Sequence, residues 1–284
     1  MKKPIIISIL CVALTVVVLL WGFQQRETNA PVNREHYALL IESDTGSFVM
    51  QLRRGMQQAA NEAGAELSIY TPDHFSQAQA LSGVVIWLKD SAAGLRLLGD
   101  TPAVVVNQNL ADAVCVQSDD QSAGKQLLRY ALAHCAPEGV LLIRDDEDAR
   151  ATERSDAAEA VARESGVQTL LYEEGLRLPD DCAYAVATSR RATLALAEQK
   201  RTGLFGGYLL GVDTGDRRVN DLEAGLVEAM ALDSPYAMGY LAFEQARMLA
   251  SGFPAEGALT RVLLATRDNM YLAENVKQVF PLLQ

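Results

Sequence analysis

Polar side chains follow directly after two apolar runs of this sequence. Asp213 ends the run Tyr208 to Val212, and Asn107 and Gln108 end the run Pro102 to Val106. Each run is short and apolar enough to be a buried strand of a parallel sheet. Open α/β sheets bind ligands at the carboxyl ends of such strands. An ionised carboxylate offers two acceptor oxygens, so Asp213 is predicted to accept hydrogen bonds from ligand hydroxyl groups.

The common signatures of catalysis are absent from the sequence. It has no Gly-x-Ser-x-Gly elbow, no P-loop, no Gly-x-Gly-x-x-Gly and no Cys-x-x-Cys. His36, His74 and His134 are far apart, and the acidic stretch at 145–148 is more typical of a solvated loop than of a cation site. We therefore predict that the protein is not an enzyme and uses no metal ion and no cofactor.

Strand and helix patterns alternate along the chain, which is typical of a doubly wound parallel α/β sheet. The first strand leads into a polar loop containing Asp44 and then into a helix that ends at Gly64. After Asp213, an amphipathic helix is expected to begin near Asn220 or Asp221, since either residue can cap it. The expected strands are residues 37–41, 66–70, 83–88, 102–106, 113–117, 140–143, 167–172, 183–187 and 208–212.

The N-terminal residues differ from the rest of the chain. Lys2 and Lys3 precede an apolar run from Pro4 to Phe23. About 20 such residues cross a membrane as a helix, whereas the apolar part of a signal peptide usually has about 7 to 15. We expect an uncleaved transmembrane anchor at residues 1–23, with a cleaved signal peptide as the alternative. Residues 24–36 form a tether, and the C-terminal domain is expected outside the cytoplasm because the lysines stay inside.

Charge and cysteine content narrow the possible partners. The net charge is −11 and no run of Lys or Arg is present, which argues against nucleic-acid binding. Cys115, Cys135 and Cys182 lie beyond the predicted anchor, each within an apolar pattern. Their odd number and apolar surroundings favour small buried thiols over a disulfide.

Residues 208–252 resemble the sugar-binding branch of the type I periplasmic binding protein superfamily, which also supplies the effector domains of lactose-repressor-type regulators. The resemblance rests on Gly211-Val212-Asp213, on a helix containing Gly225, and on Asp233-Ser-Pro235, where the family usually has Gln-x-Pro. Met238-Gly239 then opens the next helix as in the family. The same plan extends over residues 37–284.

The resemblance implies two doubly wound α/β lobes that are joined by three crossovers and enclose a cleft. The crossovers correspond to Ser118-Asp119-Asp120, to Asp233-Ser-Pro235 and to the stretch Leu259 to Ala265. The first lobe is expected to contain residues 37–118 and 235–264, and the second lobe residues 119–234 and 265–284.

The resemblance also implies ligand contacts in that cleft. Arg154 matches the arginine of a Glu-Arg element that contacts the ligand in the family, and Phe48 stands where the family places an aromatic ring against a sugar face. Asp233 replaces the usual glutamine of the second crossover. The predicted ligand-binding residues are Asp44, Phe48, Asn107, Gln108, Arg154, Asp213 and Asp233.

The function that the resemblance implies is the binding of a small polar ligand, a sugar by analogy, by closure of the lobes for ABC-type import. The partner is then a permease. One alternative is a sensor subunit read by a membrane histidine kinase. Another is a structural partner that has lost ligand binding, because Ser189-Arg190 stands where the family has Asn-Asp.

Two connections between expected strands are shorter than in the family. Residues 71–82 and 173–182 leave little room for a covering helix. We expect these segments to leave exposed apolar strips, which often mark partner sites.

Overall fold

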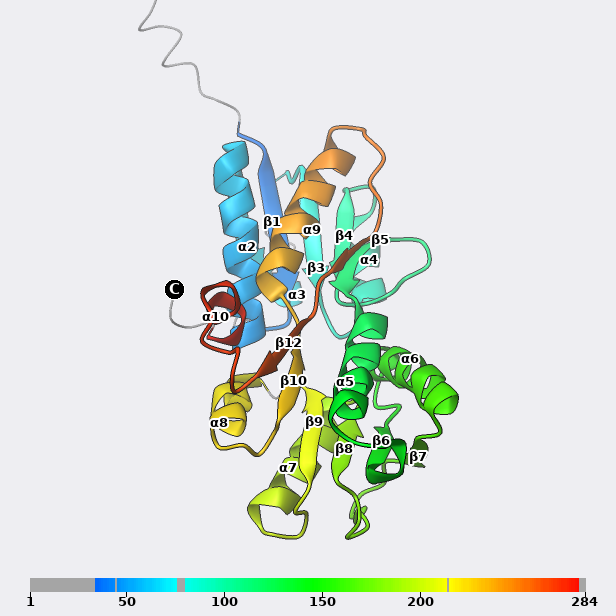
Figure 1. Ribbon diagram of the computed structural model, residues 1–284. Coiled ribbons are helices and arrows are strands. Elements are labelled where there is room, and N and C mark those ends of the chain that lie inside the picture. Colours follow the sequence, from blue (N-terminus) through cyan, green and yellow to red (C-terminus); the bar gives the residue numbers. More distant parts are fainter. Residues whose placement is uncertain (1–33, 44, 76–79, 214, 281–284) are drawn as a thin grey trace, which may run out of the picture. The chain divides into compact units, whose positions relative to one another are not determined.

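The computed structural model describes residues 34–43, 45–75, 80–213 and 215–280. The predicted anchor and most of the predicted tether lie outside these residues. Within the described part of the chain, no helix combines the length and the apolarity needed to cross a membrane. Residues 36–284 form one compact unit, and this unit contains two sheets of six strands each (Figure 1).

The first lobe is built on a parallel sheet with helices on both faces. Its elements are β1 (His36–Ile41), α2 (Ser47–Ala63), β2 (Glu66–Tyr70), α3 (Pro72–Phe75), β3 (Gly83–Trp87), α4 (Ser91–Leu98), β4 (Ala103–Val106), β5 (Val114–Ser118), α9 (Pro235–Ala250) and β11 (Ala258–Thr260). The strand order is β11-β5-β4-β3-β1-β2. Leu39 and Ile41 pack with α2 and α9, whereas Ala38 and Leu40 pack on the face of α4. Burial on both faces explains the continuous apolar runs in the sequence.

The second lobe repeats this plan with one antiparallel strand. Its elements are α5 (Asp120–His134), the 3₁₀ helix η1 (Pro137–Gly139), β6 (Val140–Arg144), α6 (Ala149–Ser165), β7 (Gln168–Leu171), β8 (Tyr184–Ala187), α7 (Arg190–Arg201), β9 (Tyr208–Val212), the 3₁₀ helix η2 (Gly215–Arg217), α8 (Arg218–Glu223), β10 (Ala229–Leu232), β12 (Leu263–Thr266) and α10 (Ala273–Val279). The strand order is β12-β10-β9-β8-β6-β7, with β12 antiparallel to β10.

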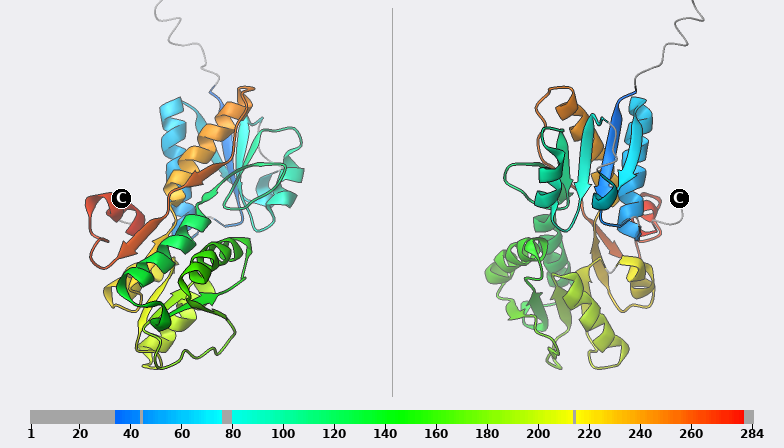
Figure 2. Two further views of the ribbon diagram at one scale, coloured as in Figure 1. Left: turned by 45° about the vertical axis from the view of Figure 1, so that its right-hand side comes forward. Right: turned by 180° about the vertical axis from the view of Figure 1, so that it is seen from behind.

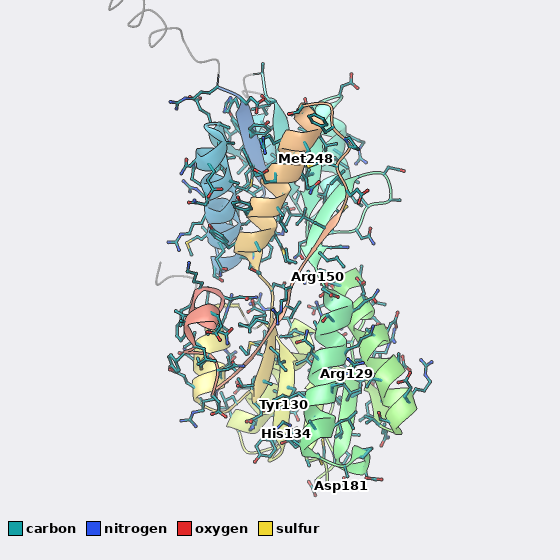
Figure 3. The ribbon with its side chains drawn as sticks, turned by 45° about the horizontal axis from the view of Figure 1, so that its top comes forward. Arg129, Tyr130, His134, Arg150, Asp181 and Met248 are labelled. Atoms are coloured by element: carbon teal, nitrogen blue, oxygen red, sulfur yellow. The ribbon has the colours of Figure 1, made fainter. Side chains whose placement is uncertain are left out.

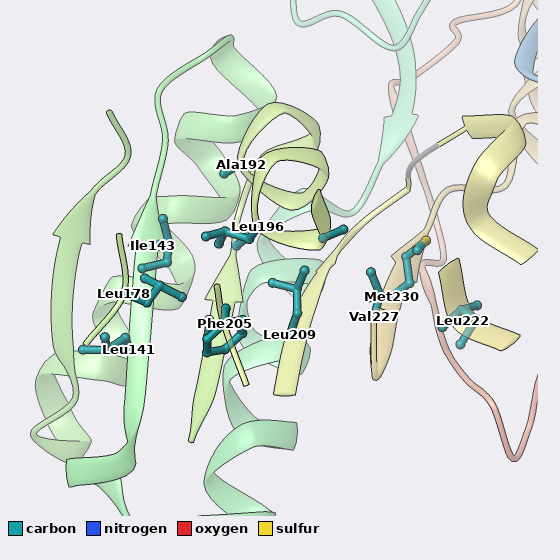
Figure 4. Close-up of a cluster of buried hydrophobic side chains, with 14 of the residues drawn as sticks. Leu141, Ile143, Leu178, Ala192, Leu196, Phe205, Leu209, Leu222, Val227 and Met230 are labelled. Atoms are coloured by element: carbon teal, nitrogen blue, oxygen red, sulfur yellow. The ribbon is translucent and has the colours of Figure 1, made fainter. Parts of the chain in front are cut away.

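The two faces of the second sheet carry different clusters. Leu142 and Val186 pack with α5 and α6, which run side by side in both views of Figure 2. On the other face, Leu141 and Ile143 join a cluster with residues of α7 and α8 (Figure 4). Val279 of α10 belongs to the same cluster. These clusters hold the strand ends of the second lobe in place.

The chain passes between the sheets three times, and the passages are bonded to one another. They join β5 to α5, β10 to α9 and β11 to β12. The Asp119 N–H donates to the Thr260 carbonyl oxygen at 3.0 Å, and the Ser118 hydroxyl donates to Asp233 at 2.7 Å. The sequence placed residues up to 264 with the first lobe, but β12 begins at Leu263 and pairs with β10 of the second sheet. The passage is therefore shorter than expected.

The helix expected near Asn220 differs from the prediction. α8 begins at Arg218, has six residues and has no side-chain cap. It ends before Gly225, whose φ of 65° is left-handed, and β10 follows at Ala229. Neither Asn220 nor Asp221 caps the helix, because both lie inside it.

The expectation of exposed apolar strips in the two short connections was wrong for the described residues. In the first connection, the Phe75 ring packs edge-on against Tyr70 with centroids 5.9 Å apart. In the second, Leu178 and Cys182 are buried in the cluster that contains α7. None of the large exposed hydrophobic side chains lies in the described parts of 71–82 or 173–182. The apolar residues of these segments pack on the faces of the two sheets, so they give no support to a partner site.

Candidate functional site

A cavity of about 430 Å³ lies where the carboxyl ends of strands from both sheets meet. Strands β1, β3 and β4 of the first lobe and β9 and β10 of the second lobe each end at its wall or one loop away from it. Its polar lining residues are Thr45, Ser47, Asn107, Asp120, Glu147, Asp148, Arg150, Arg154, Arg190, Asp213, Asp216, Arg218 and Asp233. The cleft is thus lined by charged groups of both signs.

The first lobe contributes an aromatic pair to the cavity. Phe48, in the first turn of α2, stacks on Trp87 at the end of β3, with ring centroids 5.0 Å apart and an interplanar angle of 25°. Both side chains are half-buried. The pair therefore gives the cleft a broad apolar surface beside its charged groups.

A network of arginines and carboxylates lies where the first two crossovers border the cavity. Arg150, in the first turn of α6 (Figure 3), donates to Asp120 at 2.7 Å and to Asp233 at 2.9 Å. Arg154 donates to Asp120 at 2.5 Å and to the Thr188 carbonyl oxygen at 2.7 Å. The network ties α5, α6 and the second crossover together.

The charge of Asp233 is stabilised by this network. Burial by itself raises the pKa of the carboxyl, but the Arg150 guanidinium and the hydrogen bond from Ser118 outweigh burial. The pKa of Asp233 consequently lies below its ordinary value, and Asp233 stays ionised.

Asp213 has a different environment at the other side of the cavity. It accepts from the Gly215 N–H at 2.6 Å and pairs with Arg218 at 3.2 Å. Burial raises the pKa of Asp213, and the positive charge of Arg218 only partly opposes this effect. Arg218 also donates to the Ser47 hydroxyl at 3.3 Å, so it links the loop after Asp213 to α2 of the first lobe.

Asn107 is held in an unusual conformation at the end of β4. Its φ of 62° makes it the one positive-φ residue other than glycine among the described residues. Asparagine tolerates this left-handed region better than most residues. The backbone N–H donates to the Val116 carbonyl oxygen at 2.8 Å, whereas the side-chain Oδ1 is buried without a hydrogen-bond partner in the described structure. Asn107 therefore has an acceptor available to a ligand.

The structure brings five of the predicted residues to one cavity. Phe48, Asn107, Arg154, Asp213 and Asp233 all line it. Arg154, however, is only 8% exposed, and the contacts described above already engage it. A ligand would therefore have to compete for its donors.

Two predicted residues are not in this set. Gln108 turns away, because its Nε2 donates to the Leu88 carbonyl oxygen at 2.6 Å, and it lines a neighbouring cavity instead. Asp44 lies outside the described residues. Ser189-Arg190 stands where the family has Asn-Asp. Ser189 is buried and donates to Asp145 at 2.5 Å, whereas Arg190 lines the main cavity.

Sequence reasoning missed Trp87, Asp120, Arg150, Arg190 and Arg218 in the cleft. A signal existed for some of them. Arg150 precedes Arg154 by four residues, which places both on one face of a helix, and Trp87 is at the end of an apolar run. Arg218 had no such signal.

Within the described part of the chain, no group of three or more His, Cys, Asp or Glu side chains is placed to hold a metal ion.

Comparison of the sequence with protein-family models and with curated proteins finds no match. Comparison of the fold with solved structures finds many similar chains. A periplasmic ribose ABC transporter protein from Conexibacter woesei has a TM-score of 0.72 at 15% identity, covering 87% of this chain and 97% of that chain. GanP, a glucose-galactose binding protein from Geobacillus stearothermophilus, has a TM-score of 0.68 at 18% identity, covering 84% and 100%.

A third example carries a bound sugar. An ABC transporter solute-binding protein from Agrobacterium vitis, bound with α-D-tagatopyranose, has a TM-score of 0.69 at 12% identity, covering 87% of this chain and 99% of that chain. The resemblance inferred from the sequence is confirmed at the level of the fold: the chain has the fold of the type I periplasmic sugar-binding proteins.

Proposed function

We propose that this protein is an extracytoplasmic receptor that binds a small sugar by closure of its two lobes and supplies it to an ABC-type importer. The observation that carries the proposal is the composition of the cavity. It places the stacked Phe48 and Trp87 rings opposite ionised side chains of the second lobe.

This composition matches the surface of a sugar. A sugar ring has an apolar C–H face and a rim of hydroxyl groups that donate and accept. The rings of Phe48 and Trp87 can cover the face, while Asp213 and the unpartnered Oδ1 of Asn107 accept from the hydroxyls. Arg190 contributes a donor group to the same lining.

The position of these groups in both lobes implies a closing motion. A ligand that contacts Phe48 and Asn107 of the first lobe together with Asp213 of the second gains its full set of contacts only when the lobes are close. It stabilises the closed form by its higher affinity for that state. The solved structures of similar fold support the same ligand class, because they are described as a periplasmic ribose ABC transporter, a glucose-galactose binding protein and a solute-binding protein bound with α-D-tagatopyranose.

The localisation is part of the proposal. We infer that residues 1–23 anchor the chain in the membrane with the sugar-binding unit outside the cytoplasm, because the apolar run is long enough to span and follows Lys2 and Lys3. Protease accessibility of the C-terminal domain on intact spheroplasts tests this orientation. Protection of that domain would contradict it.

The binding experiment uses the tryptophan of the cleft. Trp21 and Trp87 are the two tryptophans of the chain. In a Trp21→Phe background, the fluorescence of Trp87 reports on the cavity alone. We expect a saturable change on titration with at least one of ribose, arabinose, glucose, galactose or tagatose, matched by a thermal shift. The protein is kept in a detergent whose headgroup carries no sugar, because alkyl glycosides would compete.

A second candidate function is a structural partner whose cleft no longer binds. The ion network favours it, because Asp120, Arg150, Arg154 and Asp233 already satisfy one another without a ligand. Absence of any sugar response, in both fluorescence and calorimetry, would support this candidate and refute the receptor. A sugar response would not distinguish import from sensing, but the neighbouring genes would. Permease and ATPase genes favour import, whereas kinase and regulator genes favour sensing.

A further inference from the structure

A second cavity adjoins the first. It measures about 670 Å³ and is lined by Gln108, by residues after β3 and β4, and by the first turns of α6. Trp87, Asn107, Asp148 and Arg150 line both cavities. The two spaces are therefore neighbouring compartments of one cleft, and these shared residues mark the boundary between them.

The boundary carries an unused hydrogen-bond acceptor. Asn107 is fixed in its left-handed conformation by the bond from its N–H to Val116, and its Oδ1 is buried and unpartnered. Strained backbone conformations of this kind persist where the surrounding structure holds them, and they are concentrated at ligand sites. A group that passes from one compartment to the other can donate to this oxygen.

The walls of the second compartment are held in place by hydrogen bonds. The Gln108 Nε2 donates to the carbonyl oxygens of Leu88 and Lys89, at 2.6 and 3.3 Å, and the Lys89 N–H donates to the Glu42 carboxylate at 2.6 Å. Leu88 and Leu110 add apolar surface. The mixture of apolar surface and polar groups resembles that of the first compartment, with Trp87 common to both.

We propose that the ligand is a disaccharide, with one sugar unit against Phe48 and Trp87 and the second beyond Asn107 in the compartment beside Gln108. This inference rests on the proposed sugar-binding function and specifies its substrate class. Each compartment by itself falls within the range of roughly 300–1,000 Å³ that is typical of small-molecule pockets, so each has room for one unit.

The test compares disaccharides with their component monosaccharides by calorimetry on the full chain, in a detergent without a sugar headgroup. The probes are glucose with maltose and cellobiose, and galactose with lactose and melibiose. We expect at least one disaccharide to bind about tenfold or more tightly than either of its components.

Two matched variants locate the second unit. Ala149 is exposed, begins α6 and lines only the second compartment. Ala149→Trp fills that space, and we expect it to weaken disaccharide binding about tenfold more than monosaccharide binding. Ala160 is exposed on the same helix, about three turns further along and outside both linings. Ala160→Trp should leave both affinities unchanged. Circular dichroism of the two variants confirms that both are folded.

The outcomes separate this inference from the function on which it rests. Monosaccharides that bind as tightly as every disaccharide would overturn the inference and leave the receptor function standing. An equal loss for both ligands in Ala149→Trp would also overturn it. If neither these sugars nor those named in the fluorescence titration bind, the disaccharide inference and the receptor function are both overturned.

Discussion

Replacing Asp120 with asparagine tests whether the buried ion network stabilises the fold. The Asp120 side chain is 2% exposed and contacts Arg150 at 2.7 Å and Arg154 at 2.5 Å. Asparagine keeps the size of the side chain but removes its charge, so Arg154 loses the carboxylate that it contacts. Breaking a buried ion pair costs about 3–5 kcal/mol. Since Arg150 is 20% exposed and keeps Asp233, we expect the lower end, about 3 kcal/mol.

A surface pair of the same geometry supplies the control. Arg144 contacts Asp156 at 2.7 Å, but the Asp156 side chain is 62% exposed, and Arg144 keeps Asp146 and Glu159. Exposed pairs contribute about 0–1 kcal/mol, so Asp156→Asn should cost less than about 1 kcal/mol. The two substitutions are chemically identical and differ mainly in burial.

The assay is urea unfolding at pH 7 without ligand, followed by far-ultraviolet circular dichroism and linear extrapolation. Asp120 lies in the first turn of α5, where loss of its interaction with the helix dipole accounts for about 0.3–1 kcal/mol. That effect is too small to produce the expected difference of about 2 kcal/mol between the variants. Equal losses in the two variants would refute the argument from burial.

Three further predictions concern the cleft and the helix contact behind it. Because burial raises the pKa of Asp213, sugar affinity should fall as the pH is lowered through that raised value in wild type but not in Asp213→Asn. The same shift makes the unfolding free energy of the ligand-free protein fall as the pH rises from the ordinary aspartate pKa to the raised one. Urea unfolding at a series of pH values measures this, and an unfolding free energy that rises over that range would contradict the prediction. Asn107→Gly and Asn107→Ala should weaken sugar binding equally in calorimetry. The unfolding free energy of the alanine variant should be about 1–2 kcal/mol lower than that of the glycine variant, because the alanine Cβ is strained in the left-handed region. Gly124→Ala should destabilise by about 1–3 kcal/mol, because a Cβ there would lie 2.1 Å from the Arg154 carbonyl oxygen; a stabilised variant in urea unfolding would show that α5 and α6 can separate without cost.

The strands and their polar ends were predictable from the sequence because their signals are local. A parallel strand that is buried on both faces leaves an unbroken apolar run, and β9 has the predicted bounds, Tyr208–Val212. The residue that follows such a run must lie at the sheet edge. This reasoning is why Asp213 and Asn107 were found at the cleft.

The sequence by itself determined which residues end the strands, but only the tertiary structure decided which of them face one another. Arg154 and Asp120 are separated by 34 residues, and Arg218 and Ser47 by 171. Gln108 follows Asn107 directly, yet Asn107 lines both cavities whereas Gln108 lines only the second. Periodicity records whether a side chain is buried, because burial is repeated along each element. It does not record the partner of an ion pair, because that depends on how two distant elements pack.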